Sequence, residues 1–158
     1  MSTSSTLDSA TVTLLRETFE GPTGPSTYFI DNDPKAGFFS VLDALSAAEA
    51  SRPTRPGGPT IAGHAFHAGF HLETSSAWLR GDHDPRDWAK SWEVGKVDET
   101  AWAGIRQELR HQYAELLRTV ETEPAANGVE LASTIGAIAH AAYHLGAVRQ
   151  AIAGAQAG

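Results

Sequence analysis

Apolar residues recur every three or four positions through most of the chain, which is the spacing of one buried face on an α-helix. The clearest run extends over about 98–120, where its apolar positions are Trp102, Ile105, Leu109, Tyr113, Leu116 and Val120. The residues between them are mostly Glu, Arg and Gln, as expected for a solvated face. No stretch alternates apolar and polar residues in the manner of a half-buried strand. The pattern therefore predicts an all-α protein.

Turn and capping residues divide the chain into five predicted helices, over about 8–20, 34–50, 60–80, 98–120 and 129–153. Asp33 before Pro34 has the sequence of an N-cap followed by proline at the first helical position. Thr60 and Asp98 can begin later helices, and Gly81 can end one. The helix over about 8–20 is short. We therefore expect a four-helix bundle of the other four, with an additional short N-terminal helix packed on it.

The length of 158 residues allows one sizeable hydrophobic core. We expect a single domain over 1–158, in which the Ser/Thr-rich residues 1–7 form a disordered tail. The segment 81–97 has no clear period but contains Trp88 and Trp92, which indicates a loop with large apolar anchors. Ordered loops of this length are often functional.

Charge and hydropathy exclude several classes of partner. The chain has 19 acidic and 12 basic residues, and its net charge of -7 repels a phosphate backbone. Its N-terminus lacks the basic and apolar regions of an export signal, and no run approaches the roughly 18 apolar residues of a membrane span. We expect a cytoplasmic protein with neither nucleic acid nor a membrane as partner.

The chain has no cysteine, so disulfides, thiolate nucleophiles and sulfur-based zinc sites are excluded. Five of its seven histidines lie on two predicted helices. His64, His67 and His71 form one polar stripe on a mostly apolar helix, where buried imidazoles would be costly without partners. His140 and His144, at i and i+4, suit two neighbouring ligands of one metal ion.

The surroundings of the pair His140 and His144 bear on this interpretation. On the last helix the predicted core stripe is Leu131, Ile135, Ile138, Ala142 and Leu145, and the histidine pair falls on the opposite side among small residues. Histidine pairs at this spacing are also common on exposed helix faces, so a hydrogen-bonded surface pair is the alternative. His83 and His111 have no partner at ligand spacing and are interpreted as non-ligands.

The segments TIAGHAFHAGFHLETSSAWLRG, DWAKSW with VDETAW, and HAAYHLGAVRQ, in this order, resemble the DinB/YfiT-like metalloprotein superfamily over nearly the whole chain. The resemblance implies a DinB-like four-helix bundle that holds one divalent ion, commonly zinc or nickel, on three histidines. His140 and His144 match the HxxxH pair of that pattern, and His67 matches its single histidine. His64 and His71 lie on the same face and could replace or support His67.

Three neutral imidazoles leave a position of the ion open to water or substrate. Relatives in the superfamily include thiol S-transferases that use bacillithiol or mycothiol, and the mycothiol-dependent maleylpyruvate isomerase. The resemblance therefore implies a metal-dependent thiol transferase or related detoxification enzyme, acting on a low-molecular-weight thiol and an electrophile. The alternatives are a metal-water hydrolase, weakened by the lack of an HExxH motif, and a non-catalytic bundle that binds metal or a ligand.

Other residues have predicted roles around this site. Trp88, Trp92 and Tyr143 are candidates for a pocket wall, with plain packing as the alternative. The ligand histidines need hydrogen-bond acceptors, for which the candidates are Glu73, Asp82, Ser133 and backbone carbonyls. Arg149 falls on the other side of its helix and is expected to pair with a helix end or loop. The small-residue faces of the long helices are compatible with a homodimer.

Overall fold

The computed structural model describes residues 3–123 and 125–156, and all regular secondary structure in these ranges is helical. The α-helices are α1 (Thr3–Glu20), α2 (Phe38–Asp43), α3 (Ala47–Ala50), α4 (Ile61–Leu79), α5 (Glu99–Thr122) and α6 (Gly128–Gln156), and the long loop before α5 contains the 3-10 turn η1 (Lys90–Trp92). Over the described ranges, the prediction of an all-α protein is confirmed.

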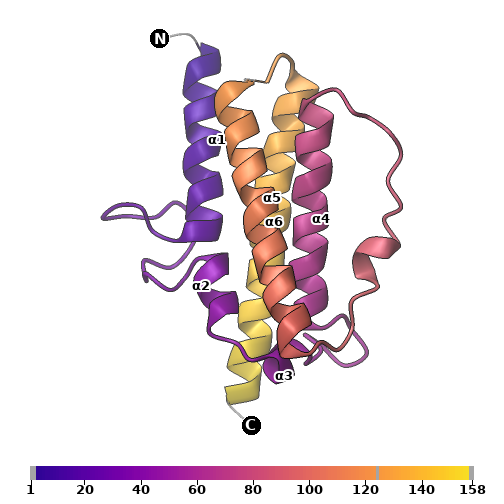
Figure 1. Ribbon diagram of the computed structural model, residues 1–158. Helices are drawn as coiled ribbons and strands as arrows, with labels where there is room; N and C mark the ends of the chain where they lie inside the picture. Colours follow the sequence, from indigo (N-terminus) through magenta and orange to yellow (C-terminus); the bar gives the residue numbers. More distant parts are fainter. Residues whose placement is uncertain (1–2, 124, 157–158) are drawn as a thin grey trace.

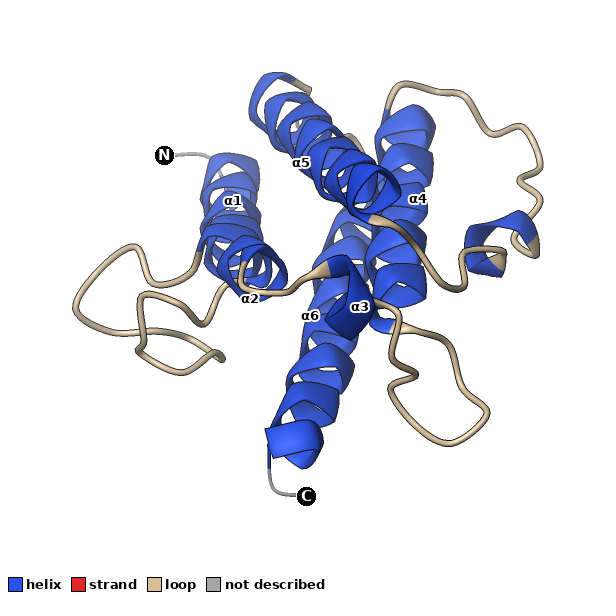
Figure 2. Cartoon of the chain, turned by 60° about the horizontal axis from the view of Figure 1, so that its bottom comes forward, coloured by secondary structure: helices blue, strands red, loops and turns tan. Residues whose placement is uncertain are grey.

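The four long helices pack side by side (Figure 1). α1 and α4 both pack against α5 and α6, and Figure 2 shows α1 and α4 on opposite sides of this pair. The helices share one core, whose largest fully buried side chains include Leu15, Phe19, Phe38, Leu42, Leu72, Trp102, Leu109 and Leu116. The site described below lies between α4 and α6, the two helices that carry the predicted ligands.

The first helix is longer than predicted. α1 begins at Thr3 and has 18 residues, so it is one of the four long helices rather than a short addition to them. The part of the predicted disordered tail over 3–7 is helical, and residues 1–2 lie outside the described residues.

The single helix predicted over 34–50 is instead two short helices, α2 and α3. Asp33 closes a turn with both its carboxylate and its carbonyl, so it does not cap a helix. The chain becomes helical only after Gly37. Gly37 lies so close to Gly21 that a Cβ on Gly37 would come within 2.4 Å of the backbone nitrogen of Gly21. Ser46 then starts α3 through a reciprocal capping box with Glu49. Strong local caps therefore interrupt the helical pattern.

The boundaries of the other helices follow their predicted signals. The hydroxyl of Thr60 accepts a hydrogen bond from the N–H of Gly63 and starts α4, and the carboxylate of Asp98 does the same for α5 through Ala101. Gly81, with a φ of 86°, follows the end of α4 in the left-handed conformation that favours glycine.

The buried face of α6 differs from the predicted one. It consists of Thr134, Ala137, Ile138, Ala141, His144, Leu145 and Val148, whereas Ile135 is 49% exposed. The prediction that His140 and His144 lie opposite the core is therefore wrong, because His144 is part of the buried face and His140 borders it. Small residues let α4 and α6 approach closely, so this contact contains few of the large apolar side chains that the prediction relied on.

Among the described helices, α6 is also the one long and apolar enough to cross a membrane by length and composition, since an 18-residue window within it has a mean hydropathy of 1.2. The expectation from the sequence was that no run of apolar residues approaches a membrane span. Core helices of soluble proteins pass the same test, and α6 packs against α1 and α4, so this finding is weak evidence for a membrane span.

Candidate metal centre

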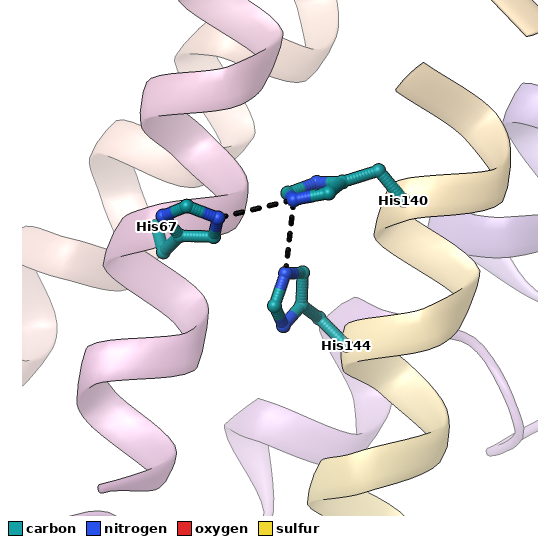
Figure 3. Close-up of side chains that lie close together, drawn as sticks. All are labelled: His67, His140 and His144. Atoms are coloured by element: carbon teal, nitrogen blue, oxygen red, sulfur yellow. Dashed lines mark hydrogen bonds between the residues drawn. The ribbon is translucent and has the colours of Figure 1, made fainter. Parts of the chain in front are cut away.

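Three histidine side chains from α4 and α6 point toward one another (Figure 3). The Nε2 atom of His67 lies 3.0 Å from that of His140, and the Nε2 atom of His144 lies 3.1 Å from it. One ring nitrogen from each histidine lies within 4.8 Å of the other two, close enough to hold a metal ion. Within the described ranges, this trio is the one group of at least three His, Asp or Glu residues with such spacing. These are the three residues predicted as ligands.

The spacing of the three nitrogens suits a divalent ion. With zinc–nitrogen distances of roughly 2.0–2.1 Å, two histidine nitrogens of a tetrahedral site lie about 3.3 Å apart. The two shortest separations in the trio, 3.0 and 3.1 Å, are a few tenths of an ångström below this value. Two of the three nitrogen separations are therefore close to those of a tetrahedral zinc site.

The hydrogen bonds of Ser91 fix the tautomer of His67. The Ser91 hydroxyl donates to the carbonyl of Trp88 at 2.6 Å, so its oxygen is left to accept from Nδ1–H of His67 at 2.7 Å. Because Nδ1 carries the proton of the neutral ring, the lone pair lies on Nε2 and points at the other two histidines. Ser91 is completely buried in η1, so this hydrogen bond is shielded from water.

A second hydrogen-bonded chain orients His144. Its Nδ1 lies 2.7 Å from Nδ1 of His64, and Nε2 of His64 lies 2.9 Å from the hydroxyl of Thr54. That hydroxyl donates to the carbonyl of Pro59 at 3.2 Å, so it accepts from His64. His64 therefore carries its proton on Nε2 and accepts from Nδ1–H of His144, which leaves Nε2 of His144 with a lone pair.

The two other histidines of α4 lie outside the trio. His64 uses Nδ1 to hold His144, and His71 stacks on the ring of His140 with centroids 3.9 Å apart and planes at 19°. The side chains predicted as hydrogen-bond acceptors for the ligand histidines have other partners or places. Asp82 pairs with Arg86, Glu73 lines a groove between α4 and α5, and the Ser133 hydroxyl donates to a carbonyl of its own helix. Ser91 and His64 take their place.

The histidines of the site are held in the neutral form. Burial is the main cause that lowers the pKa of His67 to about 4 and that of His144 to about 3, and the charge that neighbouring histidines would carry lowers both further. Burial also lowers the pKa of His140 and of His64. At neutral pH these rings are therefore uncharged, and a metal ion does not have to displace a second proton from any of them.

The long loop between α4 and α5 covers the site with tryptophans. The ring of Trp92 stacks on His67 with centroids 3.9 Å apart and planes at 17°, and Trp88 packs against Phe70 and His71. Trp92 is still 39% exposed, so one of its faces covers the histidines while part of the ring remains in contact with solvent. Figure 2 shows this loop standing beside α4 with its short 3-10 turn.

A cleft opens on each side of the trio. One, of about 530 Å³, is lined by Thr54, Arg55, Pro59, His64, Trp92, Tyr143, His144, Ala147 and Gln150. The other, of about 300 Å³, is lined by His71, Thr74, Ser75, Trp78, Trp88, Ser133, Gly136 and His140. The predicted wall residues Trp92 and Tyr143 thus line the first cleft, and Trp88 lines the second. His144 thus borders the first cleft and His140 borders the second.

The residues predicted to lie away from the site do so. His83 is on the loop, where its Nε2 lies 3.2 Å from the carbonyl of Trp78, and His111 is exposed on α5. Arg149 forms an ion pair with Asp31 of the loop after α1.

No family model, no curated protein and no solved structure matches this chain. The site is therefore interpreted from its own geometry. Sequence reasoning missed Ser91 and Thr54, and it considered His64 as a replacement or support for His67 but not as the hydrogen-bond partner of His144. The signal that could have pointed to Ser91 was its position between Trp88 and Trp92 in a loop already expected to be functional.

Proposed function

We propose that the chain is a DinB/YfiT-like metalloprotein that binds one divalent ion, zinc or nickel, through Nε2 of His67, His140 and His144. The observation that carries the proposal is the convergence of these three nitrogens, within 4.8 Å of one another, between α4 and α6. Two series of hydrogen bonds, one through Ser91 and one through His64, support the proposal. They place the ring protons of His67 and His144 on the nitrogens that face away from the trio.

The proposed activity is transfer of a low-molecular-weight thiol to an electrophile. A bound divalent ion with three protein ligands keeps a position for a small molecule and lowers the pKa of a coordinated thiol. The chain has no cysteine, so the reacting sulfur comes from a cosubstrate. In the transfer, a sulfur–carbon bond forms, the bond from that carbon to its leaving group breaks, and the thiol proton goes to solvent. Trp92 and Tyr143 line the cleft that borders His144.

Hydrolysis by a metal-activated water has less support. Such hydrolases place a carboxylate beside the metal to accept the proton of water. Across the part of the chain that the structure describes, none of the hydrogen bonds made by the five clustered histidines goes to a carboxylate. The geometry therefore favours a cosubstrate that is acidic enough to ionise without a neighbouring base.

Conjugation of a thiol to monochlorobimane tests the activity, because the bimane becomes fluorescent as chloride leaves. We expect zinc- or nickel-loaded protein to accelerate conjugation with bacillithiol or mycothiol, and chelator-treated protein and His144→Ala to lose the acceleration. His111→Ala replaces an exposed histidine of α5 and is the matched control, which should keep the wild-type rate. A metal-loaded protein that does not exceed the background rate with any bacterial thiol would favour a non-catalytic binding protein.

A further inference from the structure

Arg55 is unusual among the arginines of this acidic protein. Across the described residues, every other arginine forms an ion pair or lies close enough to a carboxylate to lower the pKa of that group. Arg55 does neither, and the one electrostatic effect found for it is on the neighbouring His64. An arginine without a carboxylate partner, on a chain of net charge -7, is free to bind an anion from solution.

The backbone holds Arg55 in a defined place. The N–H of Gly58 donates to the carbonyl of Arg55 at 2.9 Å, and Gly57 between them has a φ of 68°. This hydrogen bond, with proline second and a left-handed glycine third, is typical of a type II turn. The strand-like bridge between Pro53 and Thr60 closes the base of the turn at the start of α4. Arg55 therefore has a rigid backbone despite its exposure.

Gly58 shapes the position of the arginine side chain. A Cβ at Gly58 would come within 2.5 Å of the Cγ of Arg55, so the side chain lies directly against this glycine. Any larger residue at position 58 would push the arginine away from its present place. The turn thus fixes the backbone of Arg55, and the base of its side chain packs against the turn.

The cleft of about 530 Å³ combines this arginine with the proposed metal centre. Arg55 is the one side chain with a full charge among the residues that line it, because His64 and His144 are neutral. Tyr143 and Gln150 add a hydroxyl and an amide that can donate hydrogen bonds.

We propose that this cleft binds a small carboxylate-bearing molecule, with Arg55 pairing with the carboxylate and the reacting end directed to the histidine trio. A guanidinium matches a carboxylate with two parallel hydrogen bonds, and one arginine balances one negative charge. The proposal rests on the proposed function for the reacting end only. It names the substrate class as a thiol or electrophile with a carboxylate at one end.

Two thiols of equal length provide the test: 3-mercaptopropionate carries the carboxylate, and 3-mercapto-1-propanol replaces it with an uncharged alcohol. Isothermal titration calorimetry of zinc-loaded wild-type protein should give at least about tenfold tighter binding of the acid, the usual order for one charge-assisted pair. Arg55→Gln and Gly58→Ala should remove most of this preference and leave the affinity for the alcohol unchanged. Arg52→Gln is the matched control, because Arg52 is an exposed arginine three positions away that lines another cleft.

The outcomes separate this proposal from the proposed function. Equal affinity of the two thiols for the wild type, or an undiminished preference in Arg55→Gln, would overturn the carboxylate site. Metal content is measured on the same samples by elemental analysis. If the protein holds no metal, titration with propionate and 1-propanol replaces the thiols. Arg55-dependent binding of propionate would then support the carboxylate site while contradicting the metal centre.

Discussion

Replacing Ser91 with alanine tests the hydrogen bond that orients His67. The substitution removes the oxygen that lies 2.7 Å from Nδ1 of His67 and the hydroxyl that donates to Trp88 at 2.6 Å. Since Ser91 is fully buried, water cannot simply take its place. The ring of His67 can then move its proton to Nε2, which removes the lone pair that faces His140 and His144.

The expected loss of metal affinity follows from two estimates that agree. Removing a hydrogen-bond partner of a ligand histidine typically weakens metal binding about 10- to 100-fold. This corresponds to roughly 1.4–2.7 kcal/mol at 25 °C. A buried N–H left without an acceptor costs about 1–3 kcal/mol, which covers the same range. We therefore expect Ser91→Ala to raise the dissociation constant for zinc by one to two orders of magnitude.

Competition with a chromophoric chelator at pH 7.5 measures this dissociation constant. Ser76→Ala is the matched control, because Ser76 is a buried serine of α4 whose hydroxyl has no hydrogen-bond partner among the residues that the structure describes. Its zinc affinity should equal that of the wild type. An affinity of Ser91→Ala within about twofold of the wild type, or an equal loss in Ser76→Ala, would refute the orienting role of Ser91.

Three further perturbations test other parts of the structure. His64→Ala should weaken zinc binding about tenfold, because His144 loses its hydrogen-bond acceptor. His71→Ala removes only a stacked ring and should change the zinc affinity less than about threefold, so equal effects of the two variants would contradict the orienting role of His64. The free energy of unfolding of metal-free protein, from urea titrations, should fall as the pH decreases from about 6.5 to about 4. In this window the unfolded histidines bind protons that folded His67 and His71 do not, and a flat profile would contradict the lowered pKa values. Gly37→Ala should destabilise the protein by about 1–3 kcal/mol in the same assay, because the new Cβ would meet the backbone of Gly21. Gly24→Ala is the control and should be nearly neutral, because a Cβ there meets no described atom within 4 Å. Similar values for the two variants would show that the contact between Gly21 and Gly37 relaxes at no cost.

How well the sequence predicted each helix depended on the contrast between its faces. The helix α5 separates Trp102 and Leu109 on a buried side from charged residues on the other, and its position was predicted closely. The helix α6 has apolar and small residues all round, so its buried face could not be found from periodicity. Ile135, a large apolar residue, is half-exposed, whereas Ala137 and Ala141 are buried against neighbouring helices.

The predicted helix over 34–50 failed for another reason. Periodicity registers the apolar positions of a segment but not the competition between a continuous helix and local caps. Ser46 and Glu49 satisfy each other's backbone and side-chain groups at the start of α3, which stabilises a new helix start inside the apparent run. The contact between Gly21 and Gly37 depends on the path of the chain and has no periodic signal.

The three histidines of the trio could be predicted from their helical spacing and from the family resemblance, but the residues that orient them could not. Ser91 and Thr54 reach His67 and His64 from loops, and their hydrogen bonds span 24 and 10 positions of the chain. No helical period relates a loop residue to a helix face. The assignment of His64 and His71 likewise required the relative placement of α4 and α6.

The metal content of the purified protein tests the central claim most directly. After loading with zinc or nickel and removal of free metal, elemental analysis should find one ion per chain in the wild type and in His111→Ala. His67→Ala, His140→Ala and His144→Ala should each retain far less, because two histidines no longer hold the ion. Less than about a tenth of an equivalent in the folded wild-type protein, or full retention in the three variants, would contradict the account.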